Sequence, residues 1–389
     1  MIKVEKDFEK RLIEFRHHLH KFPELSYHEF KTTKEIIGWF ERLGLPPVNL
    51  DLETGAVFDI VGEHPGPVIA LRADIDALPM QEDNVSPYRS SVDGVMHACG
   101  HDMHTTALLG AGALLLKNRD LIKGTVRLLF QPAEEVATGA KYVCEKGALD
   151  GVDAIFGFHN IPTLPLGTIG IKSGGLMAGV DRFEVVFHGR GGHAGVPHKT
   201  IDPIIIAAEY VTNIQSIISR RINLFDNAAI SVTHIEGGST WNIIPDHATI
   251  EGTVRTFQKG SRKIIPLMMK KYAYGIAEAN DGYADFHWEG LHPVVDNDPT
   301  FRKPLEDLTL ELGYKPVEAK PSSGGEDFSF YQEQIPGFFV FIGVEGSEPW
   351  HSPIYNMKDS ALKIAVEFLA NVPLAISNHE MFRDKINIE

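Results

Sequence analysis

The chain has 389 residues, of which 43% are hydrophobic and 23% are charged, a composition typical of a folded protein with a substantial core. Because single hydrophobic cores rarely grow past about 250 to 300 residues, the length favours two domains over one. The formal charge of −15 argues against nucleic acid or an anionic membrane as a partner, since both require a basic surface, and favours a small molecule or a metal ion.

The N-terminal segment alternates charges and has no apolar signal-like core, and no apolar run approaches the ~20 residues of a membrane span. The expected location is therefore the cytoplasm. Only two cysteines are present, Cys99 and Cys144, so a disulfide framework is not expected. Cys144 lies in a helix-like stretch and is expected to be a small buried hydrophobe.

The first part of the chain is predicted to be an α/β domain with a mostly parallel sheet. Helical spacing of apolar residues covers residues 4–21 and 30–43. Short β-type runs then alternate with helical stretches, which is the pattern of strands joined by helical crossovers. The expected strands are residues 56–61, 68–72, 125–130 and 154–158, and the expected helices between them are 105–117 and 140–146.

The pattern changes after about residue 180. A strand, a helix, two strands, a helix and a strand follow one another, which is the ferredoxin-like order. From residue 292 onward the helix and strand alternation of the first domain resumes. We therefore predict a first domain formed by residues 1–180 and 291–389, interrupted by a smaller α+β domain of residues 181–290.

One short stretch, MHACGHDMHTT, carries far more ligand chemistry than packing requires: His97, Cys99, His101, Asp102 and His104. Further carboxylates and imidazoles follow the predicted strands. In an open α/β sheet the carboxyl ends of the strands are where ligands bind, so these side chains are expected to converge on one edge. They are Asp74, Asp76, Glu134, Glu135, His159 and His351.

A paired metal site accounts for this set. Thiolate, imidazole and carboxylate donors are supplied by Cys99, His101, Glu135, His159 and His351, while Glu134 stays free as a base. Neighbouring side chains on an extended segment point opposite ways, so Glu134 and Glu135 are expected to have different roles. Two ions about 3.5 to 4 Å apart activate a shared water and polarise a carbonyl, which is suited to amide hydrolysis.

The motifs RADIDALP, HACGHDMH, QPAEE, FHN, GGHAGVPH, NIIPD and SGGEDF, in this order, resemble the M20 metallopeptidase family over nearly the whole chain. The resemblance is to its amidohydrolase branch, which includes hippurate hydrolases, auxin-conjugate hydrolases and N-acetyl-diaminopimelate deacetylases. It implies a zinc-peptidase-like catalytic domain with an inserted lid that mediates dimerisation. It further implies two divalent ions per subunit, with Mn favoured and Zn possible, and an N-acyl amino acid as the substrate of a homodimer or larger homo-oligomer.

Carried over by motif, the five donors above become the metal ligands and Glu134 the general base. Asp74 matches a further catalytic position, with Asp76 as its companion, and both are expected to support a metal-side imidazole. The resemblance makes His193 of the lid a donor to the developing oxyanion in the partner subunit's active site, with Asn242 beside it. A substrate carboxylate is expected to be held by Arg255 and by the backbone amides of Gly324 and Gly325.

Several alternatives stay open at this point. Cys99 paired with His101 also matches the nucleophile and base of a thiol hydrolase. His97 and His104 are expected to be packing or supporting imidazoles rather than metal ligands. The GGLMAG stretch, residues 174–179, is expected to be a hinge rather than a phosphate loop, and SSGGED is expected either to bind substrate or to form only a turn. For function, the alternatives are a dipeptidase or carboxypeptidase with the same site, and a catalytically silent protein that binds metal or amino acid.

Overall fold

The computed structural model describes residues 1–386, which form two compact units. The first unit comprises residues 1–174, 297–320 and the described residues from 327 onward, and the second comprises residues 175–296 and 321–326. Residues 387–389, which end the predicted first domain, lie outside the described residues. The chain crosses between the units about six residues from each predicted boundary. Among the described helices, none is long and apolar enough to cross a membrane.

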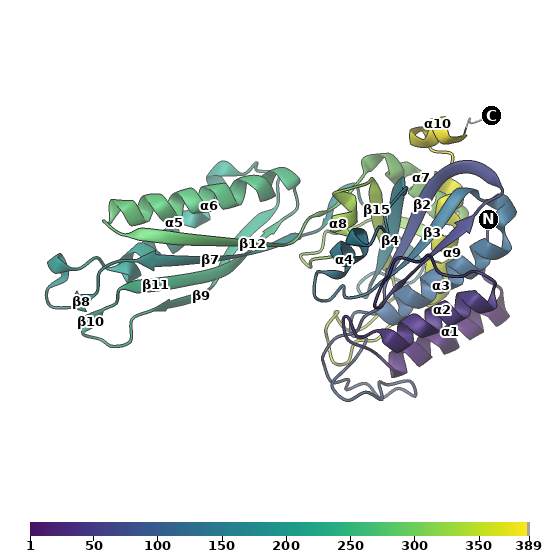
Figure 1. The fold of residues 1–389 in the computed structure, drawn as a ribbon, viewed down its shortest axis with the longest axis horizontal. Helices are drawn as coiled ribbons and strands as arrows, with labels where there is room; N and C mark the ends of the chain where they lie inside the picture. Colours follow the sequence, from purple (N-terminus) through teal and green to yellow (C-terminus); the bar gives the residue numbers. More distant parts are fainter. Residues whose placement is uncertain (387–389) are drawn as a thin grey trace. The chain divides into compact units, whose positions relative to one another are not determined.

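The first unit is built on a seven-stranded sheet (Figure 1) in the order β1-β3-β2-β4-β15-β5-β14. The four neighbours β3, β2, β4 and β15 run parallel, and β1 lies antiparallel to β3 at one edge. The parallel arrangement brings the carboxyl ends of these four strands to the same edge of the sheet. The strand bounds are β1 Ala56–Val61, β2 His64–Asp74, β3 Lys123–Gln131, β4 Ala154–Ile161, β5 Thr168–Ile171, β14 Lys315–Glu318 and β15 Gly337–Gly343.

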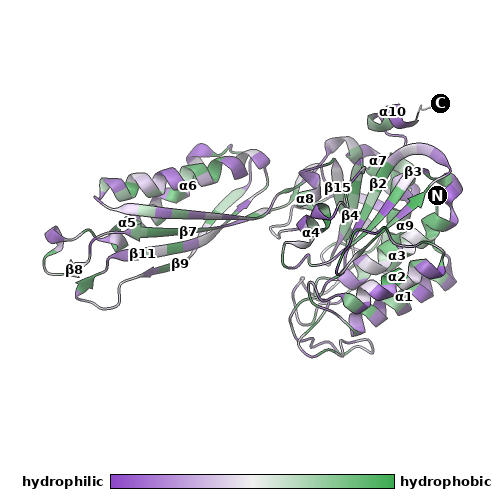
Figure 2. Ribbon diagram, in the orientation of Figure 1, coloured by the Kyte–Doolittle hydropathy of each residue, from purple (hydrophilic) through white to green (hydrophobic). Residues whose placement is uncertain are grey.

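The helices of this unit differ in how deeply they are buried. The sequences of α3 and α9 are apolar on nearly all sides, so both helices lie inside the unit and pack against each other. The N-terminal helices α1 and α2 bury only one face each, and Figure 2 shows both purple and green segments along them. The bounds are α1 Lys6–Lys21, α2 Phe30–Arg42, α3 His101–Lys117, α4 Gly139–Glu145, α7 Arg302–Glu311, α8 Ser329–Gln332, α9 Ser360–Ile376 and α10 Arg383–Ile386, with short 3₁₀ turns at Arg119–Leu121, Pro299–Phe301 and Glu380–Phe382.

The second unit has the predicted order of elements, β7-α5-β9-β11-α6-β12, and an antiparallel sheet in the order β12-β7-β11-β9. Alternate side chains of the sheet join the apolar faces of α5 and α6 in a core of their own. The bounds are β7 Gly179–His188, α5 Pro203–Arg221, β9 Ala228–Gly237, β11 His247–Thr256, α6 Lys259–Ala279 and β12 Tyr283–His292, with short pairs β6 Gly174–Met177 with β13 Val295–Asn297 and β8 Gly192–His193 with β10 Ile243–Ile244, and a 3₁₀ turn at Pro197–Lys199.

Two glycine-rich stretches take part in β pairing in this unit. The GGLMAG stretch forms β6 and the start of β7 instead of a loop around a phosphate. The segment 321–326, which holds Gly324 and Gly325, joins the second unit because Met177 pairs with Ser322 and the backbone N–H of Ala178 donates to the Ser322 carbonyl at 3.0 Å.

Candidate metal centre

The predicted metal ligands and catalytic residues of the first unit lie in several segments at one edge of the sheet. Asp74 is the last residue of β2, and His159 lies near the end of β4. Glu134 and Glu135 follow the end of β3, while His101 is the first residue of α3. Gly100, at φ 86°, turns the chain sharply into α3, a left-handed conformation that glycine adopts without a steric penalty.

Cys99 belongs to two groups of ligand atoms at once. Its Sγ lies 3.4 Å from Nε2 of His159, and one group comprises Cys99, His101 and His159. The other comprises Cys99, Glu135 and His351. Within each group the ligand atoms all lie within 4.8 Å of one another, which is close enough for one ion to touch all three. Cys99 is therefore the one residue that these two groups share.

The side chain of His101 is fixed by a carboxylate on its far nitrogen. Nδ1 lies 3.0 Å from the backbone carbonyl of Asp76 and 3.1 Å from its Oδ1, so Nε2 faces the donors of the other segments. Nε2 of His101 and Oε1 of Glu135 are both buried and have no hydrogen-bond partner among the described residues. Buried polar atoms normally have a partner, so these two orphan atoms fit a role as metal ligands.

The charges of the site also fit a cation. Burial raises the pKa of Glu135 to about 7, against the opposing effect of His101. Burial lowers the pKa of both His159 and His351, which favours the neutral imidazole that a metal ion requires. Burial alone would lower the pKa of His101, but Asp74 and Asp76 outweigh it and raise the pKa to about 10. An ion held by this imidazole would have to displace that proton.

The two glutamates sit in a turn, not in an extended segment. Ala133, at φ 55°, begins the turn, and its N–H donates to Oε1 of Glu29 at 2.8 Å. The N–H of Glu135 donates to Oδ2 of Asp76 at 3.0 Å. A carboxylate oxygen of Glu134 and one of Glu135 both lie within 4.8 Å of a nitrogen of His101. The expectation that the two carboxylates point opposite ways is therefore wrong, because the chain turns between them.

His351 differs from the other donors in its exposure, and it lies in a segment without helix or strand. Its side chain is 55% exposed, whereas Cys99, His101 and His159 are all buried. Its backbone adopts φ 62°, and its N–H donates to the carbonyl of Ala98 at 3.0 Å. Nε2 of His351 lies 3.5 Å from Oε2 of Glu135, at the exposed side of the second ligand group.

Asp74 and His104 form a buried network beside the predicted ligands. Asp74 accepts a hydrogen bond from Nδ1 of His104 at 2.6 Å and another from Nη1 of Arg72 at 2.7 Å. Nε2 of His104 accepts from the backbone N–H of Asn160 at 3.1 Å. Both nitrogens of His104 are thus engaged, which fits the expected supporting role. His97 is also buried, and burial lowers its pKa to about 4.

Sequence reasoning missed three contributors to this site: Arg72, Glu29 and Asn160. Arg72 and Glu29 were not identifiable because the strand that contains Arg72 and the loop that contains Glu29 carry no sequence motif typical of a site. Asn160 directly follows His159 in the FHN motif, so its position next to a ligand was the one available signal.

The predicted substrate residues of the second unit fall into two sets. His193 lies on β8 and pairs with Ile243 of β10, next to Asn242, whose carbonyl accepts from the N–H of Ala194 at 3.1 Å. Arg255 lies near the other end of the sheet, on β11, and its Nη1 donates to the carbonyl of Ser323 at 3.4 Å. Gly324 and Gly325 follow in the same segment, so they belong to the Arg255 set.

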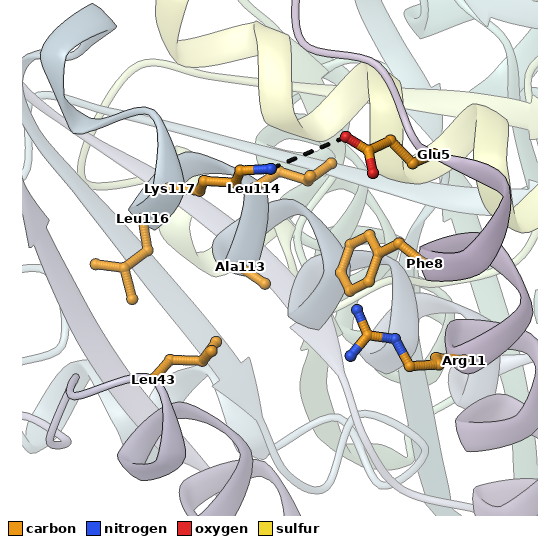
Figure 3. Close-up of a pocket in the computed structure, with 8 residues that line it drawn as sticks. All are labelled: Glu5, Phe8, Arg11, Leu43, Ala113, Leu114, Leu116 and Lys117. Carbon is orange, nitrogen blue, oxygen red and sulfur yellow. Dashed lines mark ion pairs between the residues drawn. The ribbon is translucent and has the colours of Figure 1, made fainter.

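A separate groove lies on the helical side of the first unit (Figure 3), with a volume of about 410 Å³. It contains none of the predicted ligands or substrate residues, and its rim carries an ion pair between Lys117 and Glu5 at 3.9 Å. The groove is lined by Glu5, Phe8, Arg11, Leu43, Ala113, Leu114, Leu116 and Lys117.

Comparisons with known proteins agree with this architecture. The model of peptidase family M20/M25/M40 matches residues 70–375. An N-acetylcysteine deacetylase of Bacillus subtilis (strain 168) is 49% identical over 374 residues, which cover 96% of this chain and 98% of the relative. Thermostable carboxypeptidase 2 of Saccharolobus solfataricus is 37% identical over 380 residues, which cover 95% of this chain and 96% of the relative.

Among solved structures, the Bacillus subtilis YXEP protein, a dinuclear metal-binding peptidase from the M20 family, matches with a TM-score of 0.89 and 46% sequence identity. The match covers 96% of this chain and 100% of that one. This similarity confirms the predicted fold class.

Proposed function

The chain belongs to peptidase family M20, and on that premise we propose that it removes the acyl group from an N-acylated amino acid with two divalent ions held by Cys99, His101, Glu135, His159 and His351. Family membership makes it a metal-dependent hydrolase of amide bonds, the class of enzyme that the motifs predicted. The observation that carries the ligand assignment is the position of Cys99 in both ligand groups.

The donors suit more than one ion. A thiolate favours softer ions such as Zn, whereas the carboxylate and imidazole donors also suit Mn. We propose Mn as the native ion, on the basis of the amidohydrolase branch that the motifs resemble.

Two bound divalent ions would polarise the amide carbonyl and lower the pKa of water at the site. The chain's own residues then manage the protons and the substrate. Glu134 takes a proton from the water that adds to the carbonyl carbon and returns it to the departing nitrogen as the C–N bond breaks. His193 and Asn242 donate to the developing oxyanion. Arg255 and the backbone N–H groups of Gly324 and Gly325 hold the substrate carboxylate.

The two substrate sets support a homodimer in which His193 acts in the partner subunit. Arg255 pairs with Val180 near one end of the sheet, while His247, at the other end of β11, pairs with His188. At about 3.4 Å per residue, these ends are roughly 27 Å apart. His193 lies beyond the His247 end, since Gly189 donates to the carbonyl of Asp246 there at 2.8 Å. One small substrate cannot touch both ends of one sheet, so the two sets serve one reaction only if they come from two chains.

A carboxypeptidase is the second candidate, because thermostable carboxypeptidase 2 shares 37% identity over nearly the whole chain. A peptide bond next to a free carboxylate presents the same carbonyl and the same anionic group as an N-acyl amino acid. Only the group on the acyl side differs, so the same site serves either substrate.

The experiment that tests the proposal is a measurement of amine release from a panel of N-acetyl, N-benzoyl and dipeptide substrates, with N-acetylcysteine included. Chelator-stripped protein is assayed with no metal, with Mn and with Zn. Metal-dependent release from N-acyl amino acids supports the proposal, and preference for dipeptides favours the carboxypeptidase. Reversible binding without release by folded, metal-loaded protein would instead indicate a binding protein.

A further inference from the structure

Asn160 follows the ligand His159 on β4, and its side chain is fully buried beside the metal centre. An asparagine amide offers two donor hydrogens and a carbonyl oxygen with two lone pairs. Both sides of the Asn160 amide are engaged, and their partners lie in three different segments.

The donor side of Asn160 faces the loop and helix that carry Cys99 and His101. Nδ2 donates to the backbone carbonyl of Cys99 at 2.6 Å, and it lies 2.9 Å from Nε2 of His104. His104 gives its Nδ1 hydrogen to Asp74, so Nε2 carries the lone pair that accepts from Asn160. Asn160 thereby fixes the backbone of the shared ligand.

The acceptor side of Asn160 faces the segment that carries His351. Oδ1 accepts from the indole N–H of Trp350 at 3.2 Å and from the hydroxyl of Tyr355. These two residues flank His351, which lies in a segment without helix or strand. Asn160 therefore anchors this irregular segment on both sides of the proposed ligand His351.

The backbone of Asn160 completes the arrangement. Its carbonyl accepts from Nδ1 of His159 at 2.7 Å, which turns Nε2 of that ring toward Cys99. The chain also makes room for the amide, because a Cβ on Gly100 would lie 2.5 Å from Nδ2 of Asn160. Gly100 is thus required by this contact as well as by its positive φ.

We propose that Asn160 is a positioning residue that holds Cys99, His159 and His351 at the spacing needed for a two-ion site. The inference rests on the ligand set proposed above and extends it to a residue that touches no ion. Partners of this kind orient metal ligands, and their loss typically weakens metal binding by about 10- to 100-fold.

The test is a titration of metal-stripped protein with Co²⁺, followed by the near-ultraviolet absorption that a thiolate bound to cobalt produces and by equilibrium dialysis for stoichiometry. Asn160→Asp keeps the shape but places an acceptor oxygen against the Cys99 carbonyl. It is expected to raise the dissociation constants of both ions about 10- to 100-fold and to reduce or shift the thiolate absorption. Tyr355→Phe removes only an anchor of the His351 segment. It is expected to weaken the binding of one ion, called the second ion, which the group of Cys99, Glu135 and His351 is proposed to hold.

The matched control is Asn371→Asp. Asn371 is also fully buried and accepts from the N–H of Ile2 at 2.8 Å, but its described hydrogen bonds join only Ile2 and Glu367. This variant is expected to have a lower unfolding midpoint with wild-type cobalt binding and spectrum, which separates positioning from general stability.

Folded Asn160→Asp with wild-type cobalt affinity and absorption would overturn the inference. If Asn160→Asp does not fold, Tyr355→Phe decides the question. Weaker binding of the second ion supports the inference, and wild-type binding of both ions overturns it. A wild-type protein that binds cobalt without thiolate absorption would overturn the ligand set itself, which distinguishes that failure from the failure of Asn160.

Discussion

Asp76 orients His101 with one carboxylate oxygen and holds the Glu134–Glu135 turn with the other: Oδ1 lies 3.1 Å from Nδ1 of His101, and Oδ2 accepts from the N–H of Glu135 at 3.0 Å. We predict that Asp76→Asn weakens metal binding by about 10- to 100-fold, because one amide oxygen cannot serve both donors. Equilibrium dialysis measures the affinity. Asp59→Asn, which removes one partner of the Arg127 ion pair, serves as the control and is expected to bind metal normally. Wild-type affinity in Asp76→Asn would show that this contact is dispensable.

The two glutamine variants, Glu134→Gln and Glu135→Gln, are predicted to have different effects. Glu134→Gln is expected to lower kcat at least about 100-fold with two ions still bound, because the base is lost while the ligands stay. Glu135→Gln is expected to lose an ion, since it removes a ligand from the group of Cys99 and His351. Metal content by mass spectrometry and amine release are measured on the same samples. Near-normal turnover by Glu134→Gln would remove it as the base.

The sequence allowed the order of helices and strands to be predicted well because the parallel strands are continuous apolar runs and the lid strands alternate. The proposed ligands Glu135 and His159 could be listed because they lie at or just after the ends of those strands. The boundaries were less accurate where polar residues continue an element. β2 runs on to Asp74, and α3 begins at His101 rather than Thr105, because the ligand-bearing residues themselves take part in the regular structure.

The orientation of the site side chains could not be predicted in the same way. The turn at Ala133 follows from a contact with Glu29, which is about a hundred residues away in the chain. Likewise, Asn160 faces Trp350 and Tyr355, which lie far along the sequence. Hydrogen bonds of this kind leave no periodic pattern in a single sequence, so only the three-dimensional arrangement identifies their members.

The stability of the protein is predicted to fall as the pH rises from 6.5 to 9, and His20 contributes to this fall. Nδ1 of His20 lies 3.0 Å from Oδ2 of Asp102, which also accepts from Arg16 at 2.9 Å. Burial alone would lower the pKa of His20, but the charge of Asp102 and the hydrogen bonds to Asp102 and Glu82 raise it to about 9. The folded chain therefore keeps a proton that the unfolded chain, with its ordinary histidine pKa of 6.5, releases in this range.

Because the folded state binds more protons between these two pH values, the free energy of unfolding decreases with rising pH. The contribution of His20 is fully present below pH 6.5 and is lost as the pH passes 9, with a magnitude of up to about 3 kcal/mol. Urea unfolding of metal-free protein at pH 6.5 and pH 9 measures it. His20→Gln is expected to show a smaller difference between the two pH values than the wild type. An equal difference in both proteins would mean that His20 carries no such proton.

The proposed action of His193 across two subunits makes a prediction that single variants cannot test. His193→Ala and Glu134→Gln are each expected to be nearly inactive as homodimers. When the two variants are co-expressed, the mixed dimer pairs the intact Glu134 of one chain with the intact His193 of the other and restores one of its two sites. With equal expression and random pairing, half of the dimers are mixed, so the mixture should recover about a quarter of the wild-type activity.

A mixture of Glu134→Gln with a Glu134→Gln, His193→Ala double variant is the control and should recover none. Failure of the mixed dimer, shown to be present by differential tags, would contradict action across subunits: His193 would then serve its own subunit's site without Arg255, or take no part in the reaction.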